Sequence, residues 1–434
     1  MINYIDAFFL LNELMNTQKK KRDEIRSIQE KKLKTLIKYV YENNKFYHDW
    51  LSKQNVTPSD IKKVEDIKKI PIIDKKTINE NFQDIISKGF EVNKLLKERT
   101  SGSSGKPLFL YFNPYEDLVR KAKHIRSNKN IGQRLRDNWV TITSPHHFPK
   151  NPSNVQNMLN IYNPRPVSVF SDLGSQVESI KRLEPDILDG YATSVNLLAA
   201  HVERNGIDGI NPRLIITSAE LLTKNDRDAI ESVFKVPVYD QYSCVEFGRV
   251  SWECTHRNGY HIDTDNLVVE FLDENGDEVD YGESGRIVCT SLFNYSMPLI
   301  RYSIGDSGIP DDEVCNCGIN LPLMKTVEGR NDSIFVLPNG RKLSPRALSI
   351  AMGMFKHYDT FEQFQIIQRR KDLIKMLIKT KNKALDLEDE LIAHMSNTLG
   401  IADAGVKFEV ELVDEVPPSS TGKLSYVISE INKK

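Results

Sequence analysis

Thr100-Ser101-Gly102-Ser103-Ser104-Gly105-Lys106-Pro107 is the stretch of this 434-residue sequence that decides the fold, and the apolar run Leu108-Phe109-Leu110-Tyr111-Phe112 follows it directly. Small residues let the backbone approach an anion closely. Backbone N–H groups, four hydroxyls and one ammonium could then surround phosphate oxygens. The stretch therefore favours a phosphate-binding loop that leads into a strand, with a flexible Gly/Ser turn as the alternative.

This loop differs from the Walker-type phosphate loop. Two residues separate its glycines, Pro107 follows Lys106, and the next segment reads as a strand. A Walker loop has four residues between its glycines, Ser or Thr after its lysine, and a helix behind it. The spacing thus excludes a P-loop NTPase and gives no support to a kinase.

The composition bounds the class of protein. The length suits two or three domains, and 39% hydrophobic with 27% charged residues indicates a soluble globular chain. With 59 basic and 60 acidic residues the net charge is −1, so no overall field attracts nucleic acid or a membrane surface. No apolar stretch approaches the roughly 20 residues that a membrane span needs, and Ala7 to Leu11 makes a poor signal peptide. We expect a cytoplasmic protein whose five cysteines are reduced.

The pattern changes along the chain. Residues 1–95 predict helices, with Asp74 as an N-cap. Beyond them, short apolar runs alternate with helical stretches, which is typical of α/β folds, and residues 260–310 are richer in strand signals. We therefore expect an α/β fold: a large N-terminal domain with mixed or parallel sheets flanked by helices plus a β-rich subdomain, and a small mobile α+β C-terminal domain. Residues 1–95 are predicted to form a helical region of the large domain. Residues 96–330 are predicted to form the core with the β-rich subdomain, and residues 331–434 the small domain.

Five further segments carry polar residues that could bind a ligand or take part in catalysis, and they lie at the ends of predicted strands or in loops. They are Thr217-Ser218-Ala219-Glu220, Val238 to Gly248 with Tyr242 and Glu246, Arg301-Tyr302-Ser303-Ile304-Gly305-Asp306, Gly329-Arg330-Asn331-Asp332, and Pro418-Ser419-Ser420-Thr421-Gly422-Lys423.

Together with the loop at 100–107, and in this order, these segments resemble the motifs of the adenylate-forming superfamily. Within it the chain looks closest to the phenylacetate–coenzyme A ligase family and its capsule-biosynthesis-type relatives. Glu-Phe-Gly ending at Gly248, the short overall length and the stretch Asn44-Lys45-Phe46-Tyr47 support that branch. The resemblance implies that the loop and Lys106 contact the β- and γ-phosphates of ATP. The implied nucleotide-binding residues are Thr100, Ser101, Gly102, Ser103, Ser104, Gly105, Ser218, Ala219, Glu220, Tyr242, Ser243, Asp306 and Arg330.

The resemblance also implies individual roles. Tyr242 would stack near adenine, and Glu246 would help to hold Mg²⁺, which prefers hard oxygen ligands. Asp306 would accept hydrogen bonds from the ribose hydroxyls, as a carboxylate can. Val245 stands where the family has a hydroxyl near the α-phosphate, so we expect Ser243 or water to substitute.

Two implied roles concern the small domain. Arg330 would meet the ribose, and Asp332 would be the hinge between the large and small domains. Lys423 would reach between the substrate carboxylate and the α-phosphate, where an ammonium stabilises the charge of the transition state. Lys423, Glu246 and Lys106 are thus the predicted catalytic residues.

A second constellation consists of Cys254, His256, His261, Cys315 and Cys317. Three thiols and one histidine would make a closed tetrahedral zinc site with a structural role, and several relatives carry a zinc here. We favour His261 over His256 because Gly259 to Ile262 enters the β-rich region. The alternative is a set of reduced core thiols that never meet.

The expected reaction has two steps: a carboxylic acid and Mg·ATP give an acyl-AMP and pyrophosphate, and a nucleophile then takes the acyl group. Coenzyme A is the expected acceptor, with an amine or a carrier-protein thiol as alternatives. The alternative to an enzyme is a non-catalytic relative that only binds the nucleotide. His146, His147 and Tyr242 are the predicted acid pocket, by analogy with the family. The identity of the acid is open. The N-terminal helices could contact a second copy in a homodimer or cap the large domain.

Overall fold

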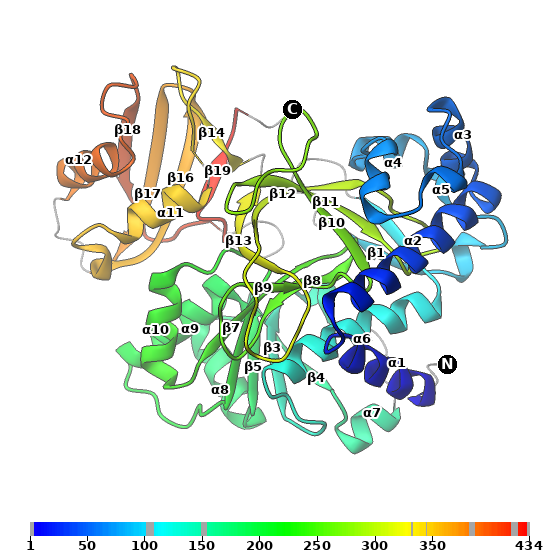
Figure 1. Cartoon of the computed structure of the whole chain (residues 1–434). Coiled ribbons are helices and arrows are strands. Elements are labelled where there is room, and N and C mark those ends of the chain that lie inside the picture. Colours follow the sequence, from blue (N-terminus) through cyan, green and yellow to red (C-terminus); the bar gives the residue numbers. More distant parts are fainter. Residues whose placement is uncertain are drawn as a thin grey trace. The chain divides into compact units, whose positions relative to one another are not determined.

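The computed structural model describes residues 4–100, 108–148, 154–330, 333–343, 345–381, 387–417 and 424–431 (Figure 1). The chain divides into two compact units, each built from two stretches of sequence. The first unit joins Met1–Gly132 to Gln241–Val327, and the second joins Gln133–Asp240 to Glu328–Lys434.

The first unit begins with helices, as the sequence predicts. They are α1 (Tyr4–Thr17), α2 (Arg22–Asn43), α3 (Lys45–Lys53), α4 (Lys75–Glu80) and α5 (Phe82–Ile85), and α6 (Pro114–Asn130) follows after a hairpin. Asp74 caps α4 by accepting a hydrogen bond from the backbone N–H of Thr77 at 2.8 Å, which confirms the predicted N-cap.

The predicted phosphate loop lies between two antiparallel strands, β1 (Leu96–Arg99) and β2 (Phe109–Phe112). Thr100 and Leu108 close its base: the Thr100 N–H donates to the Leu108 carbonyl, and the Leu108 N–H donates to Thr100 Oγ1, both at 3.0 Å. The strand expected after the loop is therefore confirmed. Residues 101–107 themselves lie outside the described residues.

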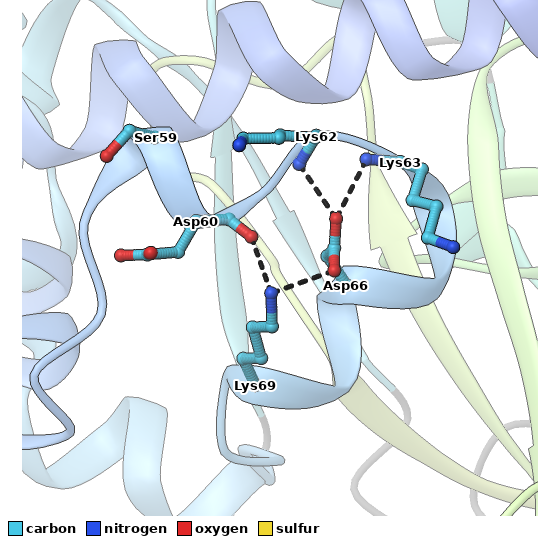
Figure 2. Close-up of a pocket in the computed structure, with 6 residues that line it drawn as sticks. All are labelled: Ser59, Asp60, Lys62, Lys63, Asp66 and Lys69. Carbon is cyan, nitrogen blue, oxygen red and sulfur yellow. Dashed lines mark hydrogen bonds and ion pairs between the residues drawn. The ribbon is translucent and has the colours of Figure 1, made fainter.

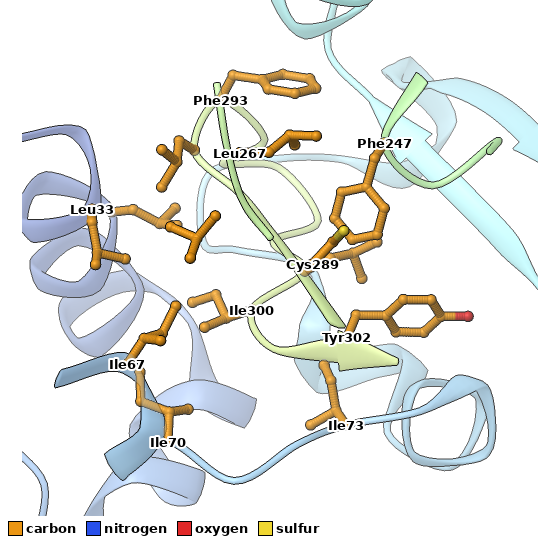
Figure 3. Close-up of a cluster of buried hydrophobic side chains, with 14 of the residues drawn as sticks. Leu33, Ile67, Ile70, Ile73, Phe247, Leu267, Cys289, Phe293, Ile300 and Tyr302 are labelled. Carbon is orange, nitrogen blue, oxygen red and sulfur yellow. The ribbon is translucent and has the colours of Figure 1, made fainter. Parts of the chain in front are cut away.

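The strands of the first unit lie in the order β10-β11-β12-β13-β9-β8-β7, and the pairs β10-β11, β11-β12, β13-β9, β9-β8 and β8-β7 are antiparallel. These strands are β7 (Val238–Cys244), β8 (Gly248–Glu253), β9 (Tyr260–Ile262), β10 (Leu267–Leu272), β11 (Gly285–Ser291), β12 (Tyr302–Asp311) and β13 (Leu323–Arg330). Hydrophobic side chains from α2 and from the segment before α4 pack against them. Figure 3 shows Leu33, Ile70 and Ile73 facing Cys289 and Tyr302 in this buried cluster.

The 133–240 part of the second unit is a parallel sheet in the order β6-β5-β3-β4. The strands are β3 (Trp139–Thr143), β4 (Pro164–Ser168), β5 (Ile187–Tyr191) and β6 (Leu214–Ser218). The helices that connect them are α7 (Asn154–Leu159), α8 (Leu173–Leu183), α9 (Ala192–Arg204) and α10 (Lys224–Phe234). Continuous apolar strands covered by amphipathic helices are typical of a parallel α/β sheet.

Residues 333–431 form a four-stranded sheet in the order β18-β17-β16-β19, with β16 and β17 as an antiparallel hairpin and both outer strands parallel to their neighbours (Figure 1). The strands of this sheet are β16 (Phe361–Arg370), β17 (Leu373–Thr380), β18 (Lys407–Leu412) and β19 (Val427–Ser429), and the helices of the region are α11 (Pro345–Gly353) and α12 (Glu388–Thr398). β14 (Phe335–Val336) and β15 (Lys342–Leu343) pair as a separate antiparallel two-stranded sheet. The predicted α+β character of the C-terminal region is confirmed, and so is the α/β fold class. None of the helices within the described ranges is both long and apolar enough to cross a membrane.

Candidate active site

Glu246 lies in the tight turn between β7 and β8. Ser243 pairs with Arg249 and Cys244 with Gly248, so Val245, Glu246 and Phe247 form the turn. Gly248 has a φ of +67°, a left-handed conformation that glycine adopts without strain. The hairpin therefore presents Glu246 at its tip, with 9% of the residue exposed.

Two tyrosine hydroxyls join this hairpin to β12. Tyr242 donates to Asp306 Oδ2 at 2.6 Å, and Tyr302 donates to Glu246 Oε1 at 3.4 Å. Burial is the main cause that raises the pKa of both phenols, so each stays a protonated donor. Three residues that the sequence singles out, Tyr242, Glu246 and Asp306, are thus brought together in the first unit. Because a carboxylate can accept about four hydrogen bonds, the bond from Tyr242 is compatible with a role of Asp306 at a ribose.

Arg249 is a neighbour that sequence reasoning missed. Its Nη1 donates to Ser243 Oγ at 2.6 Å, and its Nε donates to Ser127 Oγ at 3.0 Å. Ser243, the expected substitute for the missing hydroxyl at 245, therefore contacts a guanidinium, which can also attract a phosphate.

Arg301 fixes the start of β12. Its guanidinium forms a buried ion pair with Glu270, with Nη2 at 2.7 Å from Oε1, and Nη1 donates to the Ile70 carbonyl at 2.8 Å. Its φ of +49° is unusual for a residue other than glycine. Backbone bonds from Ile73 to Arg301 and from Ser303 to Ile73, both 2.9 Å, hold the same segment. The strand that carries Tyr302 and Asp306 is therefore anchored from two sides.

In the second unit, the predicted segment 217–220 lies at the end of β6. Ala219 has a φ of +68°, which turns the chain sharply after Ser218. Glu220 Oε2 accepts from the Thr193 N–H at 3.0 Å, and Oε1 accepts from the Leu424 N–H at 3.0 Å. Leu424 follows Lys423 directly. The carboxylate that the sequence assigned to the nucleotide thus contacts the residue next to the predicted catalytic lysine.

A second contact inside this unit involves Asp226 at the start of α10. It accepts hydrogen bonds from Asn196 Nδ2 at 2.7 Å, Thr223 Oγ1 at 2.6 Å and the Tyr426 hydroxyl at 3.2 Å. Burial raises the pKa of Asp226 to about 6. Asn225 adds a bond from its Nδ2 to the Gly353 carbonyl at 2.7 Å. Polar contacts therefore join residues 192–226 to residues 353–426.

Several predicted residues lie outside what the structure describes. Residues 101–107 with Lys106, Asp332 and Lys423 are among them, as are the side chains of His146 and Arg330. His147 is described: it belongs to the short 3₁₀ turn Pro145–His147, is exposed, and donates its N–H to the Ser144 carbonyl at 2.9 Å. Its role in the acid pocket stays a prediction.

The cysteine constellation forms a compact cluster in the first unit. One ligand atom each from Cys254, His256, Cys315 and Cys317 lies within 4.8 Å of the others, and Cys254 Sγ is 3.6 Å from Cys315 Sγ. Two thiolates on one tetrahedral zinc, each about 2.3 Å from the metal, would be about 3.8 Å apart. The three thiols that were expected to meet therefore do meet, and soft sulfur donors at this spacing fit zinc.

The compact set contains His256 in place of the expected His261. His261 is fully buried, with Nε2 at 3.3 Å from Cys317 Sγ and Nδ1 at 3.3 Å from the Leu321 carbonyl. A proton on Nδ1 that donates to Leu321 leaves a lone pair on Nε2, which is the arrangement of a metal-binding histidine. Burial lowers the pKa of His261 to about 4, which keeps it neutral. His256, which is exposed, and His261 are thus two candidates for one position.

A surface pocket of about 370 Å³ lies elsewhere in the first unit, among short 3₁₀ turns (Figure 2). Asp66 accepts from the backbone N–H groups of Lys62 and Lys63 at 2.9 and 3.1 Å, and Lys69 donates to Asp66 Oδ1 and to the Asp60 carbonyl. These groups satisfy one another and leave no reactive constellation. We assign this pocket no part in the chemistry.

Comparison with known proteins agrees with the motifs. Residues 335–430 match the family model of the CapK C-terminal domain. Protein CapK from Staphylococcus aureus is 26% identical over 432 residues, covering 94% of this chain and 90% of that protein. A phenylacetate-coenzyme A ligase from Thermus thermophilus is 24% identical over 358 residues, covering 80% and 79%. The predicted family resemblance is confirmed.

Solved structures show the same fold. A 2-hydroxyisobutyryl-CoA ligase in complex with R3-HIB-AMP gives a TM-score of 0.78 at 19% identity, covering 94% of this chain and 90% of that one. The anthranilate CoA ligase AuaEII in complex with anthranoyl-AMP gives 0.58 at 16% identity, covering 78% and 67%. The fold of this chain is therefore that of adenylate-forming CoA ligases.

Proposed function

We propose that this chain activates a carboxylic acid with ATP as an acyl-AMP and passes the acyl group to coenzyme A. The observation that carries the proposal is the group Tyr242, Glu246 and Asp306, in which Tyr242 donates to Asp306 and Glu246 accepts from Tyr302, the first residue of β12. The aromatic ring can stack on a nucleotide base, and the two carboxylates can bind a divalent cation and the ribose hydroxyls. Relatives named phenylacetate-coenzyme A ligase support the same activity.

In the proposed first step, a carboxylate oxygen of the acid attacks the α-phosphorus of ATP, and the bond to pyrophosphate breaks. Asp306 holds the ribose, the loop at 100–107 holds the β- and γ-phosphates, and Lys423 stabilises negative charge between the acid and the α-phosphate. Glu246 offers a hard oxygen donor that fits Mg²⁺. Magnesium, when bound, would neutralise charge on the triphosphate.

In the proposed second step, a thiolate attacks the acyl carbon, the thioester forms, and AMP leaves. Asp332 is the proposed hinge for the change between the two steps. An amine or a carrier-protein thiol remains an alternative acceptor, because Protein CapK, a relative over 94% of this chain, bears a name that specifies no acceptor.

The cysteine cluster belongs to the proposal as a structural zinc site. Cys254, Cys315 and Cys317 supply three thiolates, and one histidine completes a closed four-ligand set with no open position for catalysis. Thiolate ligands must stay reduced, which suits the proposed cytoplasmic location.

Acid-dependent pyrophosphate release tests the function. Purified protein is incubated with Mg·ATP and a panel of aryl, aliphatic and amino acids, and coenzyme A or amines are added to those that respond. We expect release with at least one acid, and a second product that contains the acceptor. ATP binding without pyrophosphate release for any acid would favour a non-catalytic nucleotide-binding protein instead.

A further inference from the structure

Helix α6 presents two basic side chains to the turn that carries Glu246. Arg120 and Lys123 are three residues apart, so they share one face of the helix. Arg120 Nη2 donates to the Val245 carbonyl, and Lys123 Nζ donates to the Phe247 carbonyl, each at 3.0 Å. The two carbonyls that flank Glu246 are thus both held by side-chain N–H donors from the same helix.

Lys123 is fixed in turn by its surroundings. Lys123 is fully buried, with its Nζ 2.7 Å from Asp263 Oδ2 and 4.7 Å from the centre of the Phe293 ring. One turn along, Arg126 makes two bonds to Asp265, at 2.8 and 3.0 Å. Buried charges of this kind persist when they are paired and hydrogen-bonded. The helix face is therefore a rigid support.

Arg120 is bound to the turn and to the strand after the phosphate loop. Its guanidinium carbon lies 4.1 Å from the centre of the Phe112 ring, and a Cβ on Gly248 would lie 3.7 Å from the Arg120 side chain. It also lies close enough to Glu246 for the two charges to interact. An apolar residue could pack at this position without the free-energy cost of burying a guanidinium. A charged residue here points to a role in orienting the turn.

We propose that Arg120 and Lys123 are positioning residues for Glu246, which fix both neighbouring carbonyls so that its carboxylate is held ready for a divalent cation beside Tyr302. This inference rests on the proposed function, in which Glu246 takes part in Mg·ATP binding. The cations act through the turn, and neither is assigned contact with the reacting atoms.

The test compares Arg120→Met and Arg120→Lys with Lys121→Met, an exposed neighbour on α6 that pairs with Asp117. ATP binding is measured by calorimetry over a series of Mg²⁺ concentrations. Loss of a group that orients a metal ligand typically weakens metal binding about 10- to 100-fold. We expect Arg120→Met to raise the half-saturating Mg²⁺ concentration about tenfold, at the low end of that range. Arg120→Lys should recover part of this loss, and Lys121→Met should match the unchanged protein. An unchanged Mg²⁺ requirement in Arg120→Met would overturn the inference.

Amide hydrogen exchange separates this inference from the proposed function, because it needs no ligand. Faster exchange in Arg120→Met confined to residues 245–248 is expected. If the unchanged protein fails to bind Mg·ATP, the proposed function is wrong, and this exchange pattern alone decides whether α6 holds the turn. Exchange that stays the same, or that speeds up equally in β10 and β11, would contradict a specific positioning role.

Discussion

Glu220→Gln tests the contact that joins the end of β6 to the chain beside Lys423. The Glu220 carboxylate accepts from the Leu424 N–H through one oxygen and from the Thr193 N–H through the other, both at 3.0 Å. In glutamine one of these atoms becomes an NH₂ group, which can only donate. Because the Thr193 hydroxyl also donates to the oxygen that accepts from the Thr193 N–H, the glutamine oxygen is best placed there. The NH₂ group then faces the Leu424 N–H, whose hydrogen bond is lost.

The size of the effect follows from the type of bond. A hydrogen bond to a charged group contributes about 1.5–3 kcal/mol, and each 1.36 kcal/mol in a barrier corresponds to about a tenfold change in rate. Glu220 is only partly buried, so the lower part of that range applies. If Lys423 catalyses adenylation, we expect Glu220→Gln to slow the adenylation step about tenfold or more, with little change in the KM for ATP.

The assay follows the two half-reactions separately. Acid-dependent pyrophosphate exchange reports adenylation, and the reaction of purified acyl-AMP with the acceptor reports the second step. The second step should be affected much less, since Lys423 is assigned to the first. Glu203→Gln, an exposed change on α9, is the matched control. Exchange within twofold of the unchanged protein, or an equal loss in both steps, would refute the role of this contact.

Three further predictions follow from the proposed function and from the described residues. Lys423→Ala should abolish pyrophosphate exchange while ATP still binds, and exchange at the normal rate would remove Lys423 from the mechanism. Protein purified without chelator should hold about one zinc, and Cys315→Ser should lose it. His256→Ala and His261→Ala compare the two candidate histidines, and the variant that loses zinc identifies the ligand. Less than about half an equivalent of zinc in the unchanged protein would argue against the site. The pKa of Asp226 is raised to about 6 by burial, above the value of about 3.9 in an unfolded chain. The folded state therefore binds the proton more tightly, so stability should fall as the pH rises from about 4 to 6. Asp226→Asn should flatten that part of a thermal-unfolding profile, and an unaltered slope would contradict the assignment.

The sequence predicts much of this fold because its strongest signals are local. Alternation of short apolar runs with amphipathic helices predicts the α/β class, and Asp74 marks the start of α4 through its own side chain. The cysteines could be assigned to one predicted metal site because thiolate and imidazole are specific metal donors. The order of the motifs then pointed to a superfamily.

Contacts made across long stretches of sequence were not predictable in this way. Arg120 and Lys123 lie 125 and 124 residues before the carbonyls that they hold, and nothing in a single sequence links those positions. A weak signal exists in retrospect: basic residues recur at helical spacing on the face of α6 that is buried. Likewise, the hydrogen bond from Leu424 to Glu220 was not predictable, because it depends on how residues 192–226 contact the C-terminal segment. The nucleotide-binding role of Glu220 stays a prediction.

Oxygen labelling tests the central claim most directly. The acid is supplied with ¹⁸O in its carboxylate, the reaction is run to completion with ATP and the acceptor, and the AMP is analysed by mass spectrometry. Attack of the carboxylate on the α-phosphorus leaves one labelled oxygen in each AMP after acyl transfer. Label in AMP is the predicted result, and unlabelled AMP, or labelled phosphate together with ADP, would contradict acyl adenylation by this protein.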